Sequence, residues 1–375
     1  AGPSFDSFFD ELGQDALPDS CVKICVDTAL KPLFERNTKP DLVVALDAQH
    51  WNVRDFCGTG DWRIPVAMAL SAPPAVSGVL GGDLADGMNG KCRLFWTRWT
   101  ELTVFERLAR LGLMPLELPP LGSVGLSAVS LALRLGAGTV FTVGIDLAFT
   151  LDKYHCRGSP SHGELLRRHD RLGGLYPLAA LRTVSTPVTA GAATGGPVWQ
   201  DDPVLRRCRS LFAAEFAKGG RVFTVGGSAL PGIKTVSINE ALENVKKNAA
   251  RYSGAPPNWD AECGSDCGSN CGSDCGSDCG INSAKSALLL EFIKNEEAAL
   301  GELLAVLKGE RKVTAARLDS LLDAASYLWA HFPDCAGAGG TRPPSTDIVF
   351  LKRVRAEIEP FLNLFRPAGL KAATR

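Results

Sequence analysis

Residues 122–150 read GSVGLSAVSLALRLGAGTVFTVGIDLAFT, and this stretch indicates the fold more clearly than any other part of the chain. After the first glycine turn, apolar residues recur at helical spacing up to Gly136, which is a helix stop signal. The run 140–145 then predicts a strand buried on both faces, with Asp146 at its carboxyl end. A turn, a helix, a second turn and a buried strand in this order predict an α/β protein with a ligand crevice at the strand ends.

A second unit of this kind lies nearer to the N-terminus. The apolar runs 22–26 and 42–46 are each followed by an aspartate, Asp27 and Asp47, and helical spacing begins between them at Thr28. A right-handed crossover makes the two strands parallel, so we expect both aspartates at one edge of the sheet. Asp27 can either serve a ligand there or cap the helix that Thr28 begins.

Strand and helix patterns continue to alternate as far as residue 250, which predicts a Rossmann-like, doubly wound and mostly parallel sheet. Small-residue segments between them predict loops and turns. The predicted strands are 94–96, 184–189 and 222–225, the helices are 101–110 and 202–218, and the loop and turn are 191–196 and 226–229.

Composition divides the chain into three parts. We expect residues 1–252 to form the α/β domain, 253–283 a linker and 284–375 a helical region. The segment Ala1-Gly2-Pro3-Ser4 looks like the turn after a strand, so we expect the domain to begin before Ala1. The predicted C-terminal helices are 288–308, 315–332 and 348–365, with Thr314 and either Ser345 or Thr346 as N-caps.

Charge and cysteine content limit the function. The chain has 40 Lys and Arg against 41 Asp and Glu, so no overall field attracts nucleic acid or an anionic membrane, and no long uncharged apolar run predicts a membrane span. Seven of the 12 cysteines are scattered and are expected to be reduced core thiols, consistent with a cytoplasmic protein. The other five repeat every four residues over 263–279, which favours a flexible linker over a thiolate metal site.

Polar and glycine residues gather at the predicted strand ends. Backbone amides of glycine turns suit phosphate oxygens, although tight turns need glycine whatever the function. Carboxylates at these ends could bind Mg²⁺, ribose hydroxyls or an incoming nucleophile. The residues concerned are Gly2, Ser4, Asp27, Thr28, Asp47, Gly122, Ser123 and Asp146.

Other candidates follow in the loop after Asp146. His155 is the best acid/base candidate because it lies just beyond a site strand and titrates near working pH, although a surface histidine without a role is the alternative. Arg167 and Arg168 could pair with a diphosphate or an acidic sugar, or form a solvated face. Tryptophans could stack on a base or sugar, with core packing as the default for each of Trp51, Trp62, Trp96, Trp99 and Trp199.

Four segments together resemble, in order and spacing, the motility-associated factor glycosyltransferases. The central domain of that family groups with the archaeal 6-hydroxymethylpterin diphosphokinase-like proteins. The resemblance covers roughly residues 1–250 and implies a Rossmann-like domain similar to sialyltransferases. The segments are Gly2-Pro3-Ser4, 26–49, 122–155 and 226–242.

The resemblance implies transfer of a nonulosonic acid, such as pseudaminic or legionaminic acid, from a CMP-sugar donor to Ser or Thr of flagellin. His155 would lie beside the pocket, and the residues implied to line it are Gly2, Ser4, Asp27, Asp47, Gly122, Ser123 and Asp146. One alternative is ATP-dependent diphosphate transfer to a hydroxymethylpterin, with Mg²⁺ held by the aspartates, although no Walker motif occurs. The other is a binding domain without catalysis.

Overall fold

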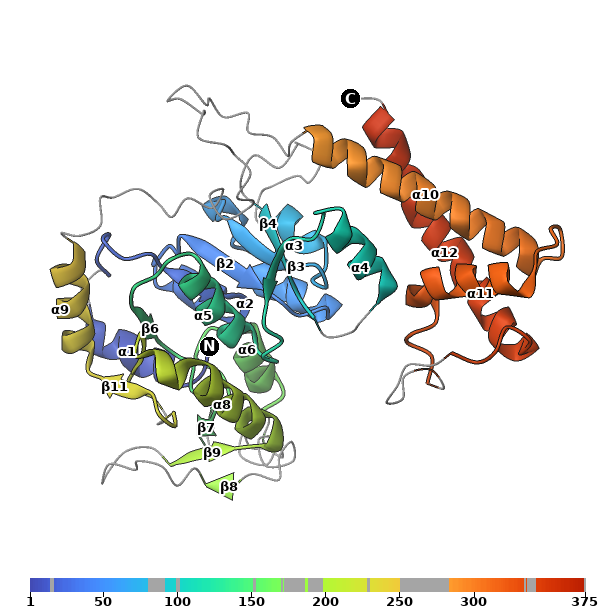
Figure 1. Ribbon diagram of the computed structural model, residues 1–375. Coiled ribbons are helices and arrows are strands. Elements are labelled where there is room, and N and C mark those ends of the chain that lie inside the picture. The colour runs from blue at the N-terminus through green and yellow to red at the C-terminus, as the bar shows by residue number, and fades with distance from the viewer. Residues whose placement is uncertain are drawn as a thin grey trace. The chain divides into compact units, whose positions relative to one another are not determined.

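The computed structural model divides the chain into two compact units (Figure 1). The first comprises Ala1–Arg98 and Leu116–Ser265, and the second comprises Trp99–Pro115 and Asp266–Arg375. The residues that the structure describes are 1–13, 17–79, 92–98, 102–150, 153–169, 171, 186–187, 198–227, 230–249, 283–333, 335 and 342–373.

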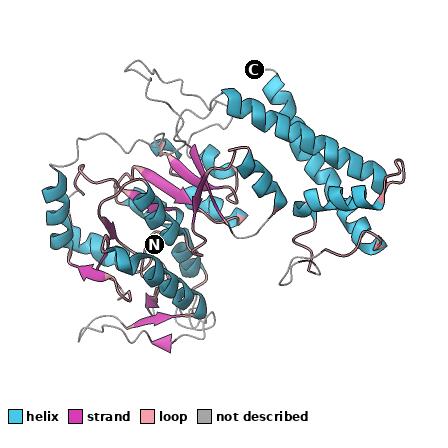
Figure 2. Cartoon of the chain, in the orientation of Figure 1, coloured by secondary structure: helices cyan, strands magenta, loops and turns pink. Residues whose placement is uncertain are grey.

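Five short strands of the first unit form an all-parallel sheet, in the order in which they occur in the chain. Both faces of the central strands are buried, because every residue of β2 and β3 lies in the core, as their continuous apolar sequences require. The strands are β1 (Ile24–Val26), β2 (Leu42–Ala45), β3 (Val66–Ala69), β4 (Cys92–Thr97) and β5 (Leu116–Leu118), drawn as magenta arrows in Figure 2.

The strand order reverses after β5. Helix α5 (Val124–Arg134) contacts β1, β2, β5 and β6 and carries the chain to a second parallel sheet, of order β11-β10-β6. Its strands are β6 (Val140–Thr142), β10 (Val222–Val225) and β11 (Lys234–Val236). The predicted α/β fold with mostly parallel strands is therefore confirmed, and the reversal between β1 and β6 is where such folds bind ligands.

Helices cover both faces of the first sheet. On one face, α2 (Asp27–Glu35) buries Leu30 and Leu33 against Val43 and Val66. On the other face, α5 buries Ala128 and Leu131 against Leu42, Val44 and Phe95. The opposite burial of neighbouring residues in β2 follows from the two-residue period of a strand.

The first unit has further short elements and a small antiparallel sheet of order β7-β9-β8. The sheet contains β7 (Phe149–Thr150), β8 (Thr186–Pro187) and β9 (Trp199–Asp201). The remaining elements are α1 (Ser4–Leu12), η1 (His50–Phe56), η2 (Gly60–Trp62), α3 (Ala75–Val79), α6 (Pro160–Arg167), α8 (Pro203–Phe216), η3 (Ala217–Gly219) and α9 (Ile238–Ala249).

The second unit is helical, as predicted, and it includes a helix from the middle of the sequence. Helix α4 lies between β4 and β5 in the chain, yet Thr103 Oγ1 donates to Asp323 O (3.0 Å) and Arg107 pairs with the buried Glu296 (2.6 Å). Its elements are α4 (Thr103–Arg110), α10 (Ser283–Leu307), α11 (Ala315–Ala324), η4 (Ser326–Leu328) and α12 (Ile348–Ala373). No helix within the described ranges is both long and apolar enough to span a bilayer.

Three local predictions were wrong. The predicted strand 140–145 ends at Thr142, and Val140 and Phe141 are only half-buried; Gly144, at φ +73°, lies in the loop that follows. The predicted helix 315–332 ends at Ala324 and continues as the short η4. The cap of α12 is Asp347, whose carboxylate accepts from the N–H groups of Val349 and Phe350.

Several predictions lie outside the described residues. These are the linker up to residue 282 with its cysteine repeat, most of the strand 184–189, the loop 191–196 and the domain boundary near 252. The predicted helix 288–308 begins earlier, at Ser283, the last residue of the predicted linker. Thr314 is confirmed as an N-cap, because its hydroxyl accepts from the Arg317 N–H.

Candidate active site

The first residues of the chain lie between the ends of two strands from different sheets. Gly2 N donates to the carbonyl of Gly144, which follows β6, at 2.7 Å. The nitrogen of Ala1 donates to Thr28 Oγ1, which follows β1, at 2.6 Å. The predicted convergence of Gly2 and Thr28 at the strand ends is therefore observed, and it occurs at the reversal of strand order.

Asp146 lies behind this segment, in the loop four residues beyond β6. Its carboxylate is buried and accepts from the N–H of Ser4, the first residue of α1, at 2.8 Å. A Cβ on either Gly2 or Gly227 would clash with a carboxylate oxygen of Asp146, so both glycines are needed to enclose Asp146. This geometry favours a positioning role for Asp146, which fixes the start of α1 against the second sheet.

Three carboxyl groups lie at the ends of β1 and β2. Asp27 is the first residue of α2 and accepts from the adjacent Thr28 N–H (2.7 Å), but the N-cap of α2 is Val26, so the predicted capping role of Asp27 is not observed. Asp47 lies just beyond β2 and accepts from the amide of Asn52 (2.8 Å). Asp55, in η1, was not a candidate in the sequence, although its charge and that of Asp47 both act on Asp27.

Burial dominates the electrostatics of this group. Burial raises the pKa of Asp27 from 3.8 to about 7, and the charges of Asp55 and Asp47 raise it in the same direction. Burial likewise raises the pKa of Asp55 to about 6, although Arg54 lowers it. Near neutral pH the cluster therefore contains carboxyl groups that can both donate and accept hydrogen bonds. Perturbed pairs of this kind concentrate at functional sites.

The N-terminus of α5 supplies positive partial charge at the same edge of the sheet. Gly122 is exposed at φ +75°, and the Ser123 side chain makes no capping bond to the helix. The first N–H groups of α5 have no acceptor within the helix itself and suit an anion. Ile145, in the loop after β6, contacts the position of a Cβ on Gly125 at 3.4 Å, which places this end of α5 beside that loop.

His155 belongs to a segment that is bonded to the start of the chain. The Cys156 N–H donates to the carbonyl of Ala1 (3.1 Å), and the half-buried His155 ring contacts Tyr154 edge to face. The Tyr154 hydroxyl in turn donates to Asp202 (3.0 Å), which caps α8. The structure therefore brings His155 close to the same segment 1–4 that covers Asp146.

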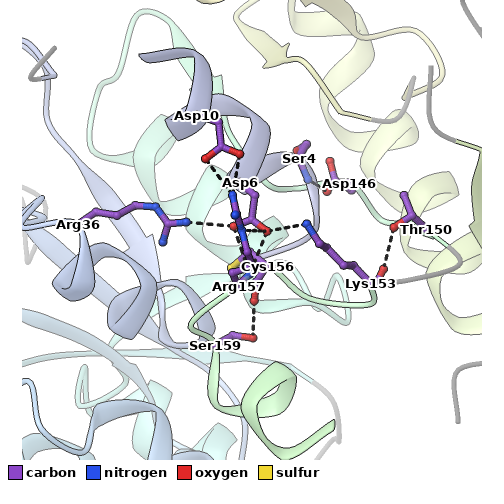
Figure 3. A network of polar contacts seen from close by, with 10 residues as sticks. All are labelled: Ser4, Asp6, Asp10, Arg36, Asp146, Thr150, Lys153, Cys156, Arg157 and Ser159. Atoms are coloured by element: carbon purple, nitrogen blue, oxygen red, sulfur yellow. Dashed lines mark hydrogen bonds and ion pairs between the residues drawn. The ribbon is translucent and has the colours of Figure 1, made fainter. Parts of the chain in front are cut away.

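Asp6, on helix α1, holds the segment 153–157 around His155 in place (Figure 3). Its buried carboxylate accepts from the Arg157 N–H (3.0 Å), and it pairs with Lys153 (3.3 Å) and Arg36 (3.1 Å). Arg157 also pairs with the exposed Asp10 at 2.6 Å. Lys153 and Arg157 flank His155 by two residues on each side, so Asp6 determines where the histidine lies.

Arg167 and Arg168, the predicted sugar-carboxylate residues, are exposed at the end of α6. Arg168 pairs with Glu164, and Glu164 also pairs with Arg54 of η1 at 2.6 Å. These bonds tie α6 to the loop that follows β2. The structure thus links Arg168 to Arg54 through Glu164, and both Arg167 and Arg168 are exposed.

Sequence reasoning missed Asp6 and Asp55. A signal existed for Asp6, which interrupts the apolar side of an amphipathic helix, whereas Asp55 lies in an irregular turn without periodicity.

The expectation that each tryptophan packs in the core was wrong for Trp51, which is 73% exposed, and correct for the buried Trp96; Trp99 lies outside the described residues. Six of the seven scattered cysteines, all but Cys335, are free thiols, and all seven except Cys21 and Cys57 are buried.

Two known proteins are similar to this chain over nearly its whole length. An uncharacterised protein of Treponema pallidum (strain Nichols) is 28% identical over 372 residues, which cover 97% of this chain and 60% of that protein. The solved MAf glycosyltransferase from Magnetospirillum magneticum AMB-1 aligns with 100% of this chain and 54% of its own, at 12% identity and a TM-score of 0.44. The chain therefore spans little more than half the length of these proteins.

A family model covers most of the site. The model described as 6-hydroxymethylpterin diphosphokinase MptE-like matches residues 1–152. This range contains Asp27, Asp47, the turn at Gly122 before α5, and Asp146. The resemblance found in the sequence is confirmed at this level, because residues 1–152 match the MptE-like model.

Proposed function

We propose that the α/β unit is a glycosyltransferase that moves a nonulosonic acid of the pseudaminic or legionaminic type from a CMP donor to Ser or Thr of flagellin. The observation that carries the proposal is the convergence of the β1, β2 and β6 ends with the N-terminus of α5 at a reversal of strand order. Three of the four sequence segments that resemble motility-associated factor glycosyltransferases contain the residues that follow β1, β2, β6 and β10. We place the reaction in the cytoplasm.

The donor phosphate would bind at the N-terminus of α5. Backbone N–H groups beside Gly122 and Ser123 point along the helix axis and stabilise the negative charge that grows on the phosphate as the sugar leaves. Asp27, Thr28 and Asp47 would contact the nucleoside portion of the donor. Helix α6 would present Arg168, and with it Arg167, to the carboxylate of the sugar.

In the transfer step, the acceptor hydroxyl oxygen attacks the anomeric carbon, and the bond from that carbon to the phosphate oxygen breaks. CMP departs with the electron pair, and His155 takes the proton of the acceptor hydroxyl. Asp146 and Asp6 do not touch the donor in this scheme. They position segment 1–4 and the loop of His155, respectively.

The assay is release of CMP from a CMP-nonulosonate in the presence of flagellin. We expect release to depend on the acceptor and to fall at least a hundredfold in the His155→Ala variant. Absence of acceptor-dependent release in the full chain would refute glycosyl transfer. A variant at exposed Glu11, Glu11→Gln, is the control and should retain full activity.

The description of the family model favours one alternative, diphosphate transfer from ATP to a hydroxymethylpterin. In that case the carboxylates at the ends of β1 and β2 would hold Mg²⁺ between phosphates. A thermal-shift comparison separates the two functions, because CMP alone should raise the midpoint of unfolding for the first, whereas only ATP with Mg²⁺ should do so for the second.

A further inference from the structure

The turn η1, which follows β2, carries chemistry that the transfer scheme leaves unused. Asp55 is only 3% exposed, and its Oδ1 has no hydrogen-bond partner among the residues that the structure describes. A buried acceptor without a donor is energetically unfavourable, so its presence needs an explanation. A ligand that supplies a donor at this point would remove the penalty.

The surroundings of Asp55 indicate what kind of donor is required. Asp27 and Asp47 lie close enough for their carboxylates to interact with it electrostatically. The Arg54 guanidinium next to it is already bonded to Glu164 and Ser161. The group is therefore rich in acceptors, and acceptors grouped in this way suit neighbouring hydroxyl groups, each of which donates one hydrogen bond.

The same turn also exposes an aromatic ring. Trp51 is 73% exposed, far more than the buried Trp96 of the same unit. Its neighbour in sequence, Asn52, donates to Asp47, so the turn that presents the ring is fixed to the acidic group. An exposed ring beside hydroxyl acceptors is the combination that binds the apolar face and the polar edge of a sugar or nucleoside.

We propose that Asp27, Asp47 and Asp55 form a subsite for the vicinal hydroxyls of a ribose ring, with Trp51 as the stacking surface beside it. Asp55 provides the central acceptor, and Asp47, held by Asn52, provides the outer one. The subsite deepens the proposed function, because it rests on a ribonucleotide donor occupying this edge of the sheet. It assigns the hydroxyl pair of that donor to η1.

The test is calorimetric titration of the full chain with CMP, 2′-deoxy-CMP and 2′,3′-dideoxy-CMP. We expect affinity to fall about tenfold or more with each hydroxyl removed, since a hydrogen bond to a carboxylate contributes that much. Asp55→Asn and Asp47→Asn should weaken CMP binding about tenfold and reduce the preference for CMP over its deoxy analogues. Trp51→Ala should weaken all three ligands alike, and Trp51→Phe should restore most of the loss.

The outcomes separate this inference from the donor proposal. Equal affinity for all three nucleotides would overturn the subsite but would not contradict the proposal of a CMP-sugar donor. If no cytidine nucleotide binds, the donor proposal fails. Titration with ribose 5-phosphate and with 2-deoxyribose 5-phosphate then tests the subsite alone, and equal affinity for the two sugars would overturn it. Stoichiometric binding of Mg²⁺ alone, lost in Asp55→Asn, would overturn it in favour of a cation site. Asp47 is exposed, so its variant tests the idea even if Asp55→Asn does not fold.

Discussion

The most distinctive physical prediction concerns the replacement of Asp27 by asparagine. Asp27 is 1% exposed, and burial raises the pKa of its carboxyl from 3.8 to about 7. Between these two pH values the folded chain holds a proton that the unfolded chain has lost. The contribution of Asp27 to the free energy of unfolding therefore falls as pH rises from about 4 to about 7 and stays constant above that range.

The magnitude follows from the interval between 3.8 and about 7, at about 1.4 kcal/mol for each pH unit. Asp27→Asn should stabilise the protein by as much as about 4 kcal/mol at pH 8 and by almost nothing at pH 4. The asparagine oxygen can still accept from the Thr28 N–H, so the hydrogen bond is conserved. The difference between the two pH values thus isolates the buried charge.

The assay is urea unfolding followed by tryptophan fluorescence at pH 4, 6 and 8. Glu11→Gln removes an exposed carboxylate from α1 and should leave the pH dependence of the wild-type chain unchanged. The reasoning would be refuted if Asp27→Asn showed the same pH dependence as wild type, or if it were less stable than wild type at pH 8.

Three further predictions test the packing around the site and in the helical unit. Gly227→Ala should destabilise the protein by at least about 2 kcal/mol because its Cβ would clash with a carboxylate oxygen of Asp146. Gly226→Ala, also at positive φ but with open space around its Cβ, should cost only about 1 kcal/mol, and equal midpoints of thermal unfolding for the two variants would contradict this. Asp6→Asn should destabilise the protein by about 3 kcal/mol and speed amide hydrogen exchange over 153–157, whereas Asp10→Asn should change stability by less than about 1 kcal/mol. Slow exchange over 153–157 in both variants would contradict the role given to Asp6. Glu296→Ala should destabilise the helical unit by about 3 kcal/mol in a denaturant titration because it leaves a partly buried arginine unpaired, and a neutral effect would show that the pair is dispensable.

The sequence predicted the architecture where periodicity and burial agree. The runs before Asp27 and Asp47 are short and apolar on both faces, and a parallel buried strand is the arrangement that such runs favour. Helix α5 was predicted within two residues at its start, because a glycine turn and Gly136 mark its ends. The glycine at 144 ended β6 earlier than the apolar run indicated, since its φ of +73° is incompatible with a strand.

Candidate site residues could be predicted only where they follow strand ends. Asp27, Asp47 and Asp146 were predicted from their positions, but the sequence could not distinguish the enclosed Asp146 from the exposed Asp47, because that difference arises from Gly2, Ser4 and Gly227 packing together in space. The sequence also could not predict that α4 belongs to the helical unit. Its contacts to α11 and η4 join residues more than two hundred positions apart.

The central claim is that the N-terminus of α5 binds the phosphate of a CMP-sugar. The most direct measurement is calorimetric titration with CMP-N-acetylneuraminic acid of the wild-type chain, Ser123→Ala and Ser123→Glu. The wild-type chain and the alanine variant should bind within about threefold of each other, because the serine side chain does not cap the helix. The glutamate variant should lose at least tenfold in affinity, because its carboxylate repels the phosphate at the helix end. Equal affinity in the glutamate variant, or no binding by the wild-type chain, would contradict the claim.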